Sequence, residues 1–448
     1  MAIAAISALV TMTLLPTAAA AYVDGGALAG TPVTVAAGPG NQSDPHVSGD
    51  LVTYTLDGTS IGFADLATGA SGVVPKPVGA HDVLSDVSGS RIAFVRWDDA
   101  TGSNIVVHDL ATGTSTVLDP QAEGTRTNPA IGGDAVVFED LGVVRIFDLA
   151  SGAITLLANG SQPAISSDGT LVTWMSGGQV YLARRGASDW TTSTTQVVTD
   201  VGAGFAPAID GTGDSGILAY AGGGDIHWRV RSASGTLGPE QTVALPGVDV
   251  DPSVAGSVIL FRHQLHDGSS TDVFFFDAST GVLNSVTNTP GVSETLSDVS
   301  VRADGSFVLV WVVRSALGDD DVLGFVTPPT AVGYAFGGFS APVNNAPTIN
   351  EARAGQTIAV KWRLTDAAGA PITDPLSFTS LTSSSASCDL GTATDAIETY
   401  SGGSGLQYLG DGIWQFNWKT PKAYAGQCRA MSLNLADGTS YTAQFRFR

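Results

Sequence analysis

The chain has 448 residues, 43% of them hydrophobic, and its 55 Gly and 21 Pro indicate short elements joined by many turns. Lys and Arg number 20 against 42 Asp and Glu, which gives a net charge of −22. This charge repels phosphate backbones and anionic lipid surfaces, so it argues against binding to nucleic acid or to a membrane surface. It suits a soluble extracellular protein, or one that binds cations or basic partners.

The first 21 residues are apolar and end in Ala19-Ala20-Ala21, a small-residue pattern typical of signal-peptide cleavage. No Lys or Arg precedes the apolar run, so the positive segment of a typical signal peptide is missing. The run is too short and too rich in Ala and Thr for a stable transmembrane helix. We therefore expect a signal peptide over residues 1–21 and a secreted protein without stable membrane insertion.

One pattern recurs along most of the chain. It consists of an inner segment of the type Pro-x-Val, a Gly turn, two apolar strands separated by a polar loop, and Asp-Leu-Ala-Thr-Gly or a related turn. The inner segments begin 34 to 46 residues apart, at Pro45, Asp86, Pro129, Pro163, Pro207, Pro252 and Asp298. Repeats of this length with four short strands are typical of propeller blades. The sequence predicts an all-β fold with a β-propeller of about seven blades over residues 31–329.

The second strand of each repeat is rich in Val, Ile and aromatic residues, as a sheet packed between two other sheets requires. These strands are predicted to begin at Leu51, Arg91, Ala135, Leu171, Gly216, Val258 and Phe307. The seventh repeat ends one strand short, at Pro328, whereas residues 31–35 form an isolated strand-like segment. We expect that segment to pair with the last blade, because this closes the ring and removes an exposed sheet edge. Repeats one and seven are the least regular, so six or eight blades remain alternatives.

The repeats resemble the TolB-like (WD-type) β-propeller family, in which a Ser-x-Asp-Gly-type turn precedes an apolar strand. Ser166-Ser167-Asp168-Gly169 is the best match, and the resemblance covers about residues 31–327. It implies a fold and not a chemistry, because such repeats occur in periplasmic scaffolds, peptidase accessory domains and polysaccharide lyases.

The repeat is lost from about Ala331, and residues 331–448 form a second predicted domain. Its strands alternate apolar and polar residues, for example over 357–362 and 413–418. Val360-Lys361-Trp362 and Trp418-Lys419-Thr420 resemble the PxKF domain of bacterial secreted and surface proteins, although Ala359 stands where that family has Pro. The resemblance implies a small β-sandwich of immunoglobulin type and no activity.

Both cysteines, Cys388 and Cys428, fall in this second domain. In an exported protein the simplest interpretation is one disulfide, which closes about 40 residues and stabilises the fold by roughly 4 kcal/mol. A zinc site would need further ligands, and none of the six His lies after residue 266.

Candidate ligand-binding residues lie in the polar loops between second and third strands, which open on one face of a propeller. They are His263, His266, Asp267 and Asp272 in the sixth repeat, Asp98 and Asp99 in the second, and Asp319, Asp320 and Asp321 in the seventh. Carboxylates and imidazoles gathered at one mouth of the channel would allow Ca²⁺ or another metal to bind. A solvated acidic rim is the favoured alternative, so we expect no cofactor.

No assembled catalytic site is predicted. We expect a monomeric secreted bacterial binding or scaffold protein that takes an extracellular protein or glycan on one propeller face. The alternative is a metal-dependent carbohydrate-active enzyme, a polysaccharide lyase or hydrolase, because TolB-like lyases place metal-binding His near the axis. That function requires His46 and His81 to line the channel and converge with His263. The small side chains at equivalent inner positions, Ala130, Ala164, Ala208 and Ser253, argue against it. A structural surface-layer component is a third possibility.

Overall fold

The chain comprises two compact units, the first ending at Pro328 and the second beginning at Pro329. The computed structural model describes residues 22–120, 124–186, 189–191, 193–199, 203–213, 215–265, 268, 270–314, 318–329, 334–366, 369–373, 375–387, 394–396, 405–435 and 439–448. The predicted signal peptide over 1–21 lies outside them. Among the described residues no helix is long and apolar enough to cross a membrane.

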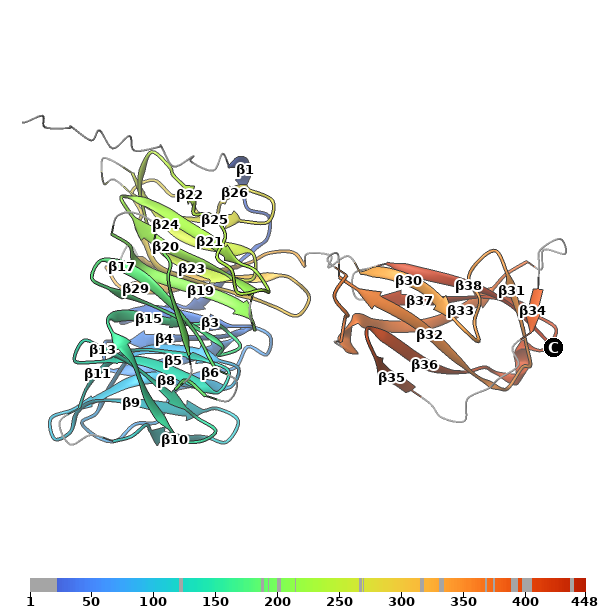
Figure 1. Ribbon diagram of the computed structural model, residues 1–448, viewed down its shortest axis with the longest axis horizontal. Coiled ribbons are helices and arrows are strands. Elements are labelled where there is room, and N and C mark those ends of the chain that lie inside the picture. Colours follow the sequence, from blue (N-terminus) through green and yellow to red (C-terminus); the bar gives the residue numbers. More distant parts are fainter. Residues whose placement is uncertain are drawn as a thin grey trace, which may run out of the picture. The chain divides into compact units, whose positions relative to one another are not determined.

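Apart from β1 (Val23–Ala27), the described strands of the first unit form seven groups of four, and each group is one blade (Figure 1). The innermost strands are β3 (Gln42–Ser48), β7 (His81–Ser88), β11 (Gly124–Gly132), β15 (Ser161–Ile165), β19 (Phe205–Thr212), β23 (Gly247–Ala255) and β27 (Glu294–Val301). The second strands are β4 (Leu51–Leu56), β8 (Arg91–Asp98), β12 (Ala135–Asp140), β16 (Leu171–Ser176), β20 (Ser215–Gly222), β24 (Val258–Leu265) and β28 (Phe307–Arg314). All seven predicted second strands are confirmed.

The third strands follow the second ones in antiparallel order. They are β5 (Ser60–Asp65), β9 (Gly102–Asp109), β13 (Val143–Asp148), β17 (Gln179–Arg184), β21 (Asp225–Arg231), β25 (Thr271–Asp277) and β29 (Asp320–Val326). The outer strands are β6 (Ser71–Val73), β10 (Thr114–Val117), β14 (Ile154–Asn159), β18 (Thr194–Val197), β22 (Gln241–Val243), β26 (Val282–Ser285) and β2 (Thr31–Ala36).

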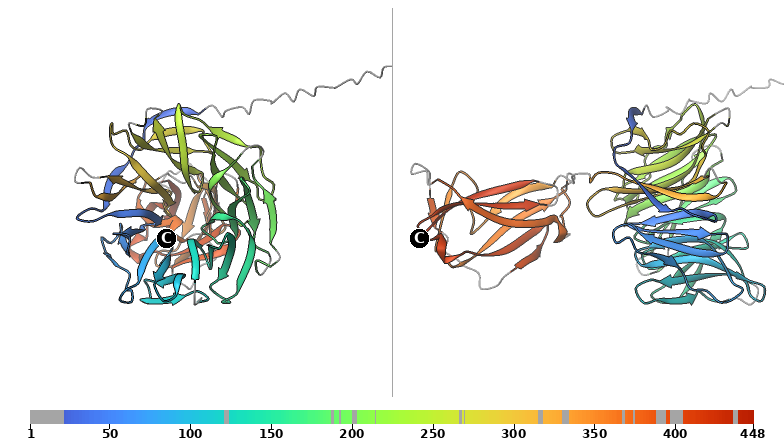
Figure 2. Two further views of the ribbon diagram at one scale, coloured as in Figure 1. Left: turned by 90° about the vertical axis from the view of Figure 1, so that its left-hand side faces the viewer. Right: turned by 180° about the vertical axis from the view of Figure 1, so that it is seen from behind.

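The blades form a closed ring (Figure 2). Each innermost strand contacts the innermost strand of the next blade, and β27 of the last blade contacts β3 of the first. Apolar clusters fill the spaces between neighbouring blades. One joins Ile61 of β5 to Ile92 and Phe94 of β8, and another joins Val52 of β4 to Val310 of β28. Stacking blades therefore buries the strongly apolar second strands on both faces.

The ring closes through the N-terminal strand, as the sequence predicts. β2 pairs antiparallel with β29, with Thr31 opposite Val326 and Thr34 opposite Leu323. β1 (Val23–Ala27) adds in parallel to β26 at the outer side of the sixth blade. The last blade therefore takes its outer strand from the start of the chain, and β29 has no exposed edge.

A β-bulge interrupts the pairing of every innermost strand at the same place. In each blade, the residue two positions before the central residue of the Pro-x-Val motif has a positive φ, between 47° and 54°. These residues are Asp44, Leu84, Asn128, Gln162, Ala206, Asp251 and Leu296. The register shifts just there, for example between Ser43 and His46. A bulge of this kind bends the strand and re-aims its side chains, and here the central residue of each motif lines the channel.

The second unit is a sandwich of two sheets. One sheet has the order β30 (Ala335–Ser340), β32 (Thr357–Thr365), β36 (Ile413–Lys419), β35 (Gly405–Gly410). The other has the order β33 (Phe378–Ser385), β37 (Cys428–Leu435), β38 (Ser440–Phe447), β31 (Ile349–Ala352), β34 (Thr394–Ala396). Two short 3₁₀ segments, η1 (Pro375–Ser377) and η2 (Lys422–Tyr424), connect strands.

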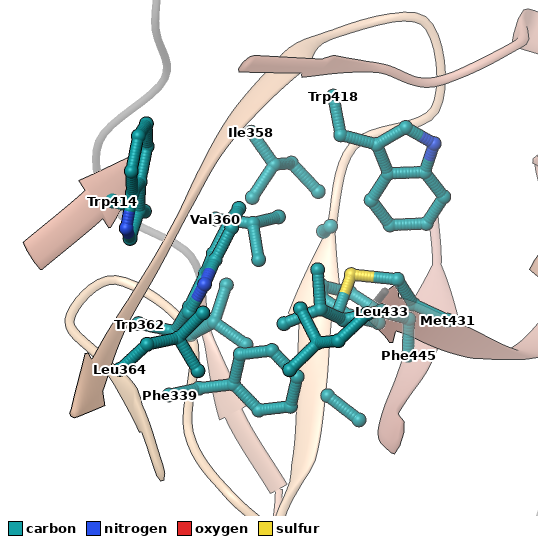
Figure 3. Close-up of a cluster of buried hydrophobic side chains, with 14 of the residues drawn as sticks. Phe339, Ile358, Val360, Trp362, Leu364, Trp414, Trp418, Met431, Leu433 and Phe445 are labelled. Atoms are coloured by element: carbon teal, nitrogen blue, oxygen red, sulfur yellow. The ribbon is translucent and has the colours of Figure 1, made fainter. Parts of the chain in front are cut away.

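The core of this sandwich comes from the inward residues of both sheets (Figure 3). Trp362 and Trp414 of the first sheet and Met431, Leu433 and Phe445 of the second are at most 2% exposed. Alternation along the strands directs these side chains to one face, as expected for sheet-on-sheet packing. Cys428 is buried at the start of β37 and is not a free thiol. Cys388 lies outside the described residues, so the Cys388–Cys428 pairing stays a prediction.

Candidate functional site

The centre of the propeller is a channel of about 610 Å³, lined by the seven bulged inner strands. Its wall is apolar on one side of the ring and polar on the other. Ala130, Ala164 and Ala208 make one side small and apolar, whereas His46, Asp86, Ser253 and Asp298 make the other side polar. These residues occupy the same position in their repeats, so the shared backbone geometry brings them to one level of the channel.

His46 lies between carboxylates contributed by both neighbouring blades. Its Nδ1 is 3.5 Å from Asp298 Oδ2 and 3.6 Å from Asp86 Oδ1, and its Nε2 is 3.8 Å from Asp44 Oδ1. The Ser253 hydroxyl donates a hydrogen bond to Asp298. The His46 side chain keeps 35% of its surface exposed, so channel solvent screens these contacts.

The carboxylates perturb the titration of this cluster. Burial opposes protonation of His46, but hydrogen bonds to Asp298 and Asp44 and the charges of Asp298 and Asp86 outweigh it, so its pKa is raised well above the usual value. Burial raises the pKa of Asp86 to about 6, although His46 partly offsets the effect. The pKa of Asp298 is lowered, because contacts with His46, Ser253 and the Val47 N–H outweigh burial. The surrounding carboxylates therefore favour the protonated form of His46.

Both channel carboxylates also brace neighbouring blades. Asp298 Oδ2 accepts the Val47 N–H at 2.9 Å, and Asp86 Oδ2 accepts the Ile131 N–H at 2.7 Å. Each bond runs from the motif centre of one blade to the Val or Ile of the next. The polar groups of the channel thus satisfy one another, and the cluster is first of all a device that holds inner strands together.

The end of the propeller where the inner strands begin carries exposed apolar side chains. We call it the mouth face; the loops between second and third strands lie at the same end because these strands are antiparallel. Trp97 is 42% exposed, Leu141 81%, Phe205 38%, Leu265 40% and Leu296 45%. Leu296 lines the channel entrance, and its positive φ belongs to the repeated bulge. Large apolar groups gathered at one face are a common feature of interaction surfaces.

The predicted position of His263 is wrong: it lies within β24 and not in a loop. The pairing of β24 with β25 continues to Gln264 and Thr271, so the hairpin is longer than expected. His263 is 5% exposed, and its Nδ1 lies 2.7 Å from Asp249 Oδ1. Asp272 is directly opposite His263 on β25. His266 and Asp267 lie outside the described residues.

Several of the acidic residues predicted for the loops form hydrogen bonds or ion pairs with nearby groups. Asp98 ends β8 and accepts hydrogen bonds from Ala100 and from the N–H and hydroxyl of Thr101. Asp99 lies in the following turn. Asp320 and Asp321 belong to β29, just after Asp319; Asp320 pairs with Arg314 at 3.3 Å, and Asp321 accepts the Gly38 N–H. In the described part of the chain no three His, Cys, Asp or Glu form a group that could hold a metal ion.

The three histidines needed by the enzymatic alternative occupy different surroundings. His46 lines the channel. His81 begins β7, is exposed and packs edge-on against Trp97, with ring centroids 5.6 Å apart. His263 is buried in the sixth blade. Convergence around a common metal is not seen among the described residues, and no observation favours lyase or hydrolase chemistry.

Sequence reasoning missed Asp86 and Asp298 as neighbours of His46. Both were visible as motif centres of the second and seventh repeats, in the position that His46 holds in the first. In a closed ring the first repeat lies between the second and the last. The order of the repeats around a closed ring is therefore the signal that predicts that the three side chains lie together.

No family model and no curated protein matches this chain. Among solved structures it is similar to the β-propeller domain of the Trilobed protease from Pyrococcus furiosus, with 14% identity over 65% of this chain and 93% of that one, and a TM-score of 0.47. TolB from Acinetobacter baumannii shows 16% identity over 65% and 79%, and a TM-score of 0.36. An acylaminoacyl peptidase shows 12% identity over 72% and 61%, and a TM-score of 0.46. The propeller assignment therefore rests on the sheets of the chain itself.

Proposed function

We propose that this chain is a secreted binding or scaffold protein that takes an extracellular protein ligand on the mouth face of its propeller. The observation that carries the proposal is the set of exposed apolar side chains on the mouth face, among them Leu141 at 81% and Leu296 at 45%. Burying such side chains against a partner releases about 25 cal/mol per Å² of apolar surface. The second unit serves as a spacer or attachment module.

The chemistry of the face indicates the kind of partner. The exposed Leu, Trp and Phe side chains of this face suit the apolar core of a protein interface. The net charge of −22 favours a partner with a basic rim, because opposite charges increase the association rate. A glycan ligand would depend mainly on stacking against exposed aromatic rings of this face such as Trp97 and Phe205.

The test compares capture of envelope proteins by three forms of the protein. In the mouth-face variant Leu141→Asp is combined with Leu296→Asp. In the matched control Leu156→Asp is combined with Val197→Asp, two exposed positions on the outer strands β14 and β18. A captured protein is identified by mass spectrometry and its affinity is then measured in purified form. We expect the mouth-face variant to lose at least about tenfold in affinity and the control to keep it.

Equal loss in both variants, or no loss in either, would contradict the proposal. A glycan array measured in parallel separates the two ligand classes. Binding to a glycan that Trp97→Ala abolishes and Leu141→Asp leaves unchanged would replace the protein ligand by a carbohydrate.

A further inference from the structure

A second cavity, of about 500 Å³, lies in the sixth blade. It is formed by the ends of β24, β25 and β26 together with the segments before β23 and after β26. It shares no lining residue with the central channel. We call it the blade-six pocket.

Three charged side chains form a row across this blade. Asp249, His263 and Asp272 are direct cross-strand neighbours on β23, β24 and β25, so they share one face of the sheet. Asp249 is fully buried and accepts the His263 Nδ1–H at 2.7 Å and the Leu245 N–H at 3.0 Å. With the Nδ1 proton directed at Asp249, the Nε2 atom of a neutral imidazole is left as a hydrogen-bond acceptor.

His263 and Asp272 line the pocket and are 5% and 8% exposed. Within the described structure Asp272 forms no ion pair, and its Oδ1 accepts only the Thr289 N–H, at 3.2 Å. His263 Nε2 has no hydrogen-bond partner among the described residues. The pocket therefore presents two largely buried acceptor side chains side by side, and the Thr289 N–H is the donor that the described residues supply to them.

The charge around the pocket is also uncompensated. Neither Lys nor Arg occurs among the described residues that line it. Glu294, at the start of β27, is 2% exposed, and its Oε2 has no hydrogen-bond partner among the residues that the structure describes. Burial, and then the charge of Asp272, raises the pKa of Glu294 to about 7. A positive charge beside Asp272 would relieve this repulsion.

The remaining wall is mixed: Ser270, Ser285, Thr287 and Asn288 line part of it, and apolar side chains line another part. Leu245, Leu265 and the Phe274 ring line the pocket, and Phe274 packs edge-on against His263 with ring centroids 5.6 Å apart. Gly247 keeps the space beside the imidazole open, because a Cβ there would lie 2.5 Å from His263 Cε1 and 3.0 Å from Nε2. An occupant thus meets both the two acceptors and an apolar surface.

We propose that the blade-six pocket binds a small organic cation, in which a primary ammonium donates to Asp272 and to Nε2 of His263 while an apolar body packs on Phe274 and Leu265. An ammonium has three N–H donors and so serves both acceptors at once. A bare metal ion fits less well, since the described residues contain no group of three ligands there and a cavity of about 500 Å³ holds an organic molecule.

The proposal is tested by calorimetric titration of the full chain with phenethylamine, with phenethyl alcohol as its neutral counterpart and Zn²⁺ as a separate probe. Asp272→Asn preserves an acceptor for the Thr289 N–H but removes the charge. His263→Asn retains a donor toward Asp249 but removes Nε2. Asp98→Asn, on another blade, is the control, because it removes one negative charge as Asp272→Asn does. Circular dichroism establishes that each variant is folded.

We expect saturable 1:1 binding of phenethylamine, at least about tenfold weaker binding to Asp272→Asn and to His263→Asn, and unchanged binding to Asp98→Asn. Phenethyl alcohol should bind at least about tenfold more weakly than the amine.

No saturation by about 10 mM amine would overturn the proposal. Equal affinity for amine and alcohol, an equal effect of Asp98→Asn, or 1:1 binding of Zn²⁺ without the amine would also overturn it. The mouth-face variant should bind phenethylamine normally, so this test and that of the protein ligand fail separately.

Discussion

At the scale of single residues, the centre of the Pro-x-Val motif has two roles. Where it is Ala, it leaves the channel open; where it is Asp, it accepts an N–H from the next blade, as Asp86 does from Ile131 and Asp298 from Val47. His46 then supplies the positive charge that two converging carboxylates require. The bracing is concentrated on the arc that includes the junction of the first and last blades.

We predict that His46→Gln lowers the melting temperature more at pH 6 than at pH 10. The pKa of His46 is raised in the folded state, so its stabilisation is fully present below the unfolded value of about 6.5 and is lost as pH rises through the folded value. Hydrogen bonds to charged groups contribute about 1.5–3 kcal/mol, and solvent in the channel reduces this to about 1 kcal/mol. Differential scanning calorimetry at both pH values measures the effect. An equal loss at both would show that His46 acts by packing alone.

Glu294, unlike His46, destabilises the fold when it is charged. Its folded pKa of about 7 lies above the ordinary glutamate value of 4.5, so its ionisation lowers stability as pH rises from the unfolded to the folded pKa. We predict that Glu294→Gln raises stability at pH 8 by about 2 kcal/mol and changes it little at pH 4. Urea unfolding at the two pH values provides the measurement. Destabilisation at pH 8 would indicate that the ionised carboxylate has a partner that compensates its charge.

At the scale of elements, two local devices repeat around the ring. The inner-strand bulge aims the motif centre into the channel. The Asp-x-x-Thr/Ser-Gly turn closes the hairpin of the third and fourth strands, because its Asp accepts backbone N–H groups of the same turn. Asp65 accepts from Ala67, Asp109 from Ala111 and Asp277 from Ser279.

The closing strand β2 is the element with the largest long-range effect. We predict that a chain starting at residue 37 is less stable than one starting at residue 30 by about 3 kcal/mol, because Val33 and Val35 lose their packing and β29 becomes an open edge. Urea denaturation followed by tryptophan fluorescence compares the two. The chain starting at residue 30 is the control, since it lacks β1 but keeps β2. Equal midpoints would mean that the ring closes without this strand.

At the scale of the whole molecule, each unit has a core of its own. Apolar clusters between blades stabilise the propeller, and a separate cluster around Trp362 and Phe445 fills the sandwich. We predict two calorimetric transitions for the full chain, each matching that of the isolated unit, residues 22–328 or 329–448. A single transition absent from both isolated units would contradict this. Trp362→Ala should lower only the transition of the sandwich.

The sequence by itself determined the repeat, the seven second strands, the closing strand and the hairpin turns, because each depends on local apolar patterning or on turn chemistry within a few residues. The binding residues were harder to predict. Asp98, Asp320 and Asp321 bind their own loops and strand neighbours, and His263 lies inside a hairpin longer than its polar sequence indicated.

Only the tertiary structure decided which polar residues meet. His46, Asp86 and Asp298 come from the first, second and last repeats and converge because the ring closes, which no local pattern encodes. The Asp249–His263–Asp272 row depends on the register of three strands, and a shift of one residue would turn His263 to the other face of the sheet. Strand positions follow from short-range sequence, whereas sites depend on long-range register and closure.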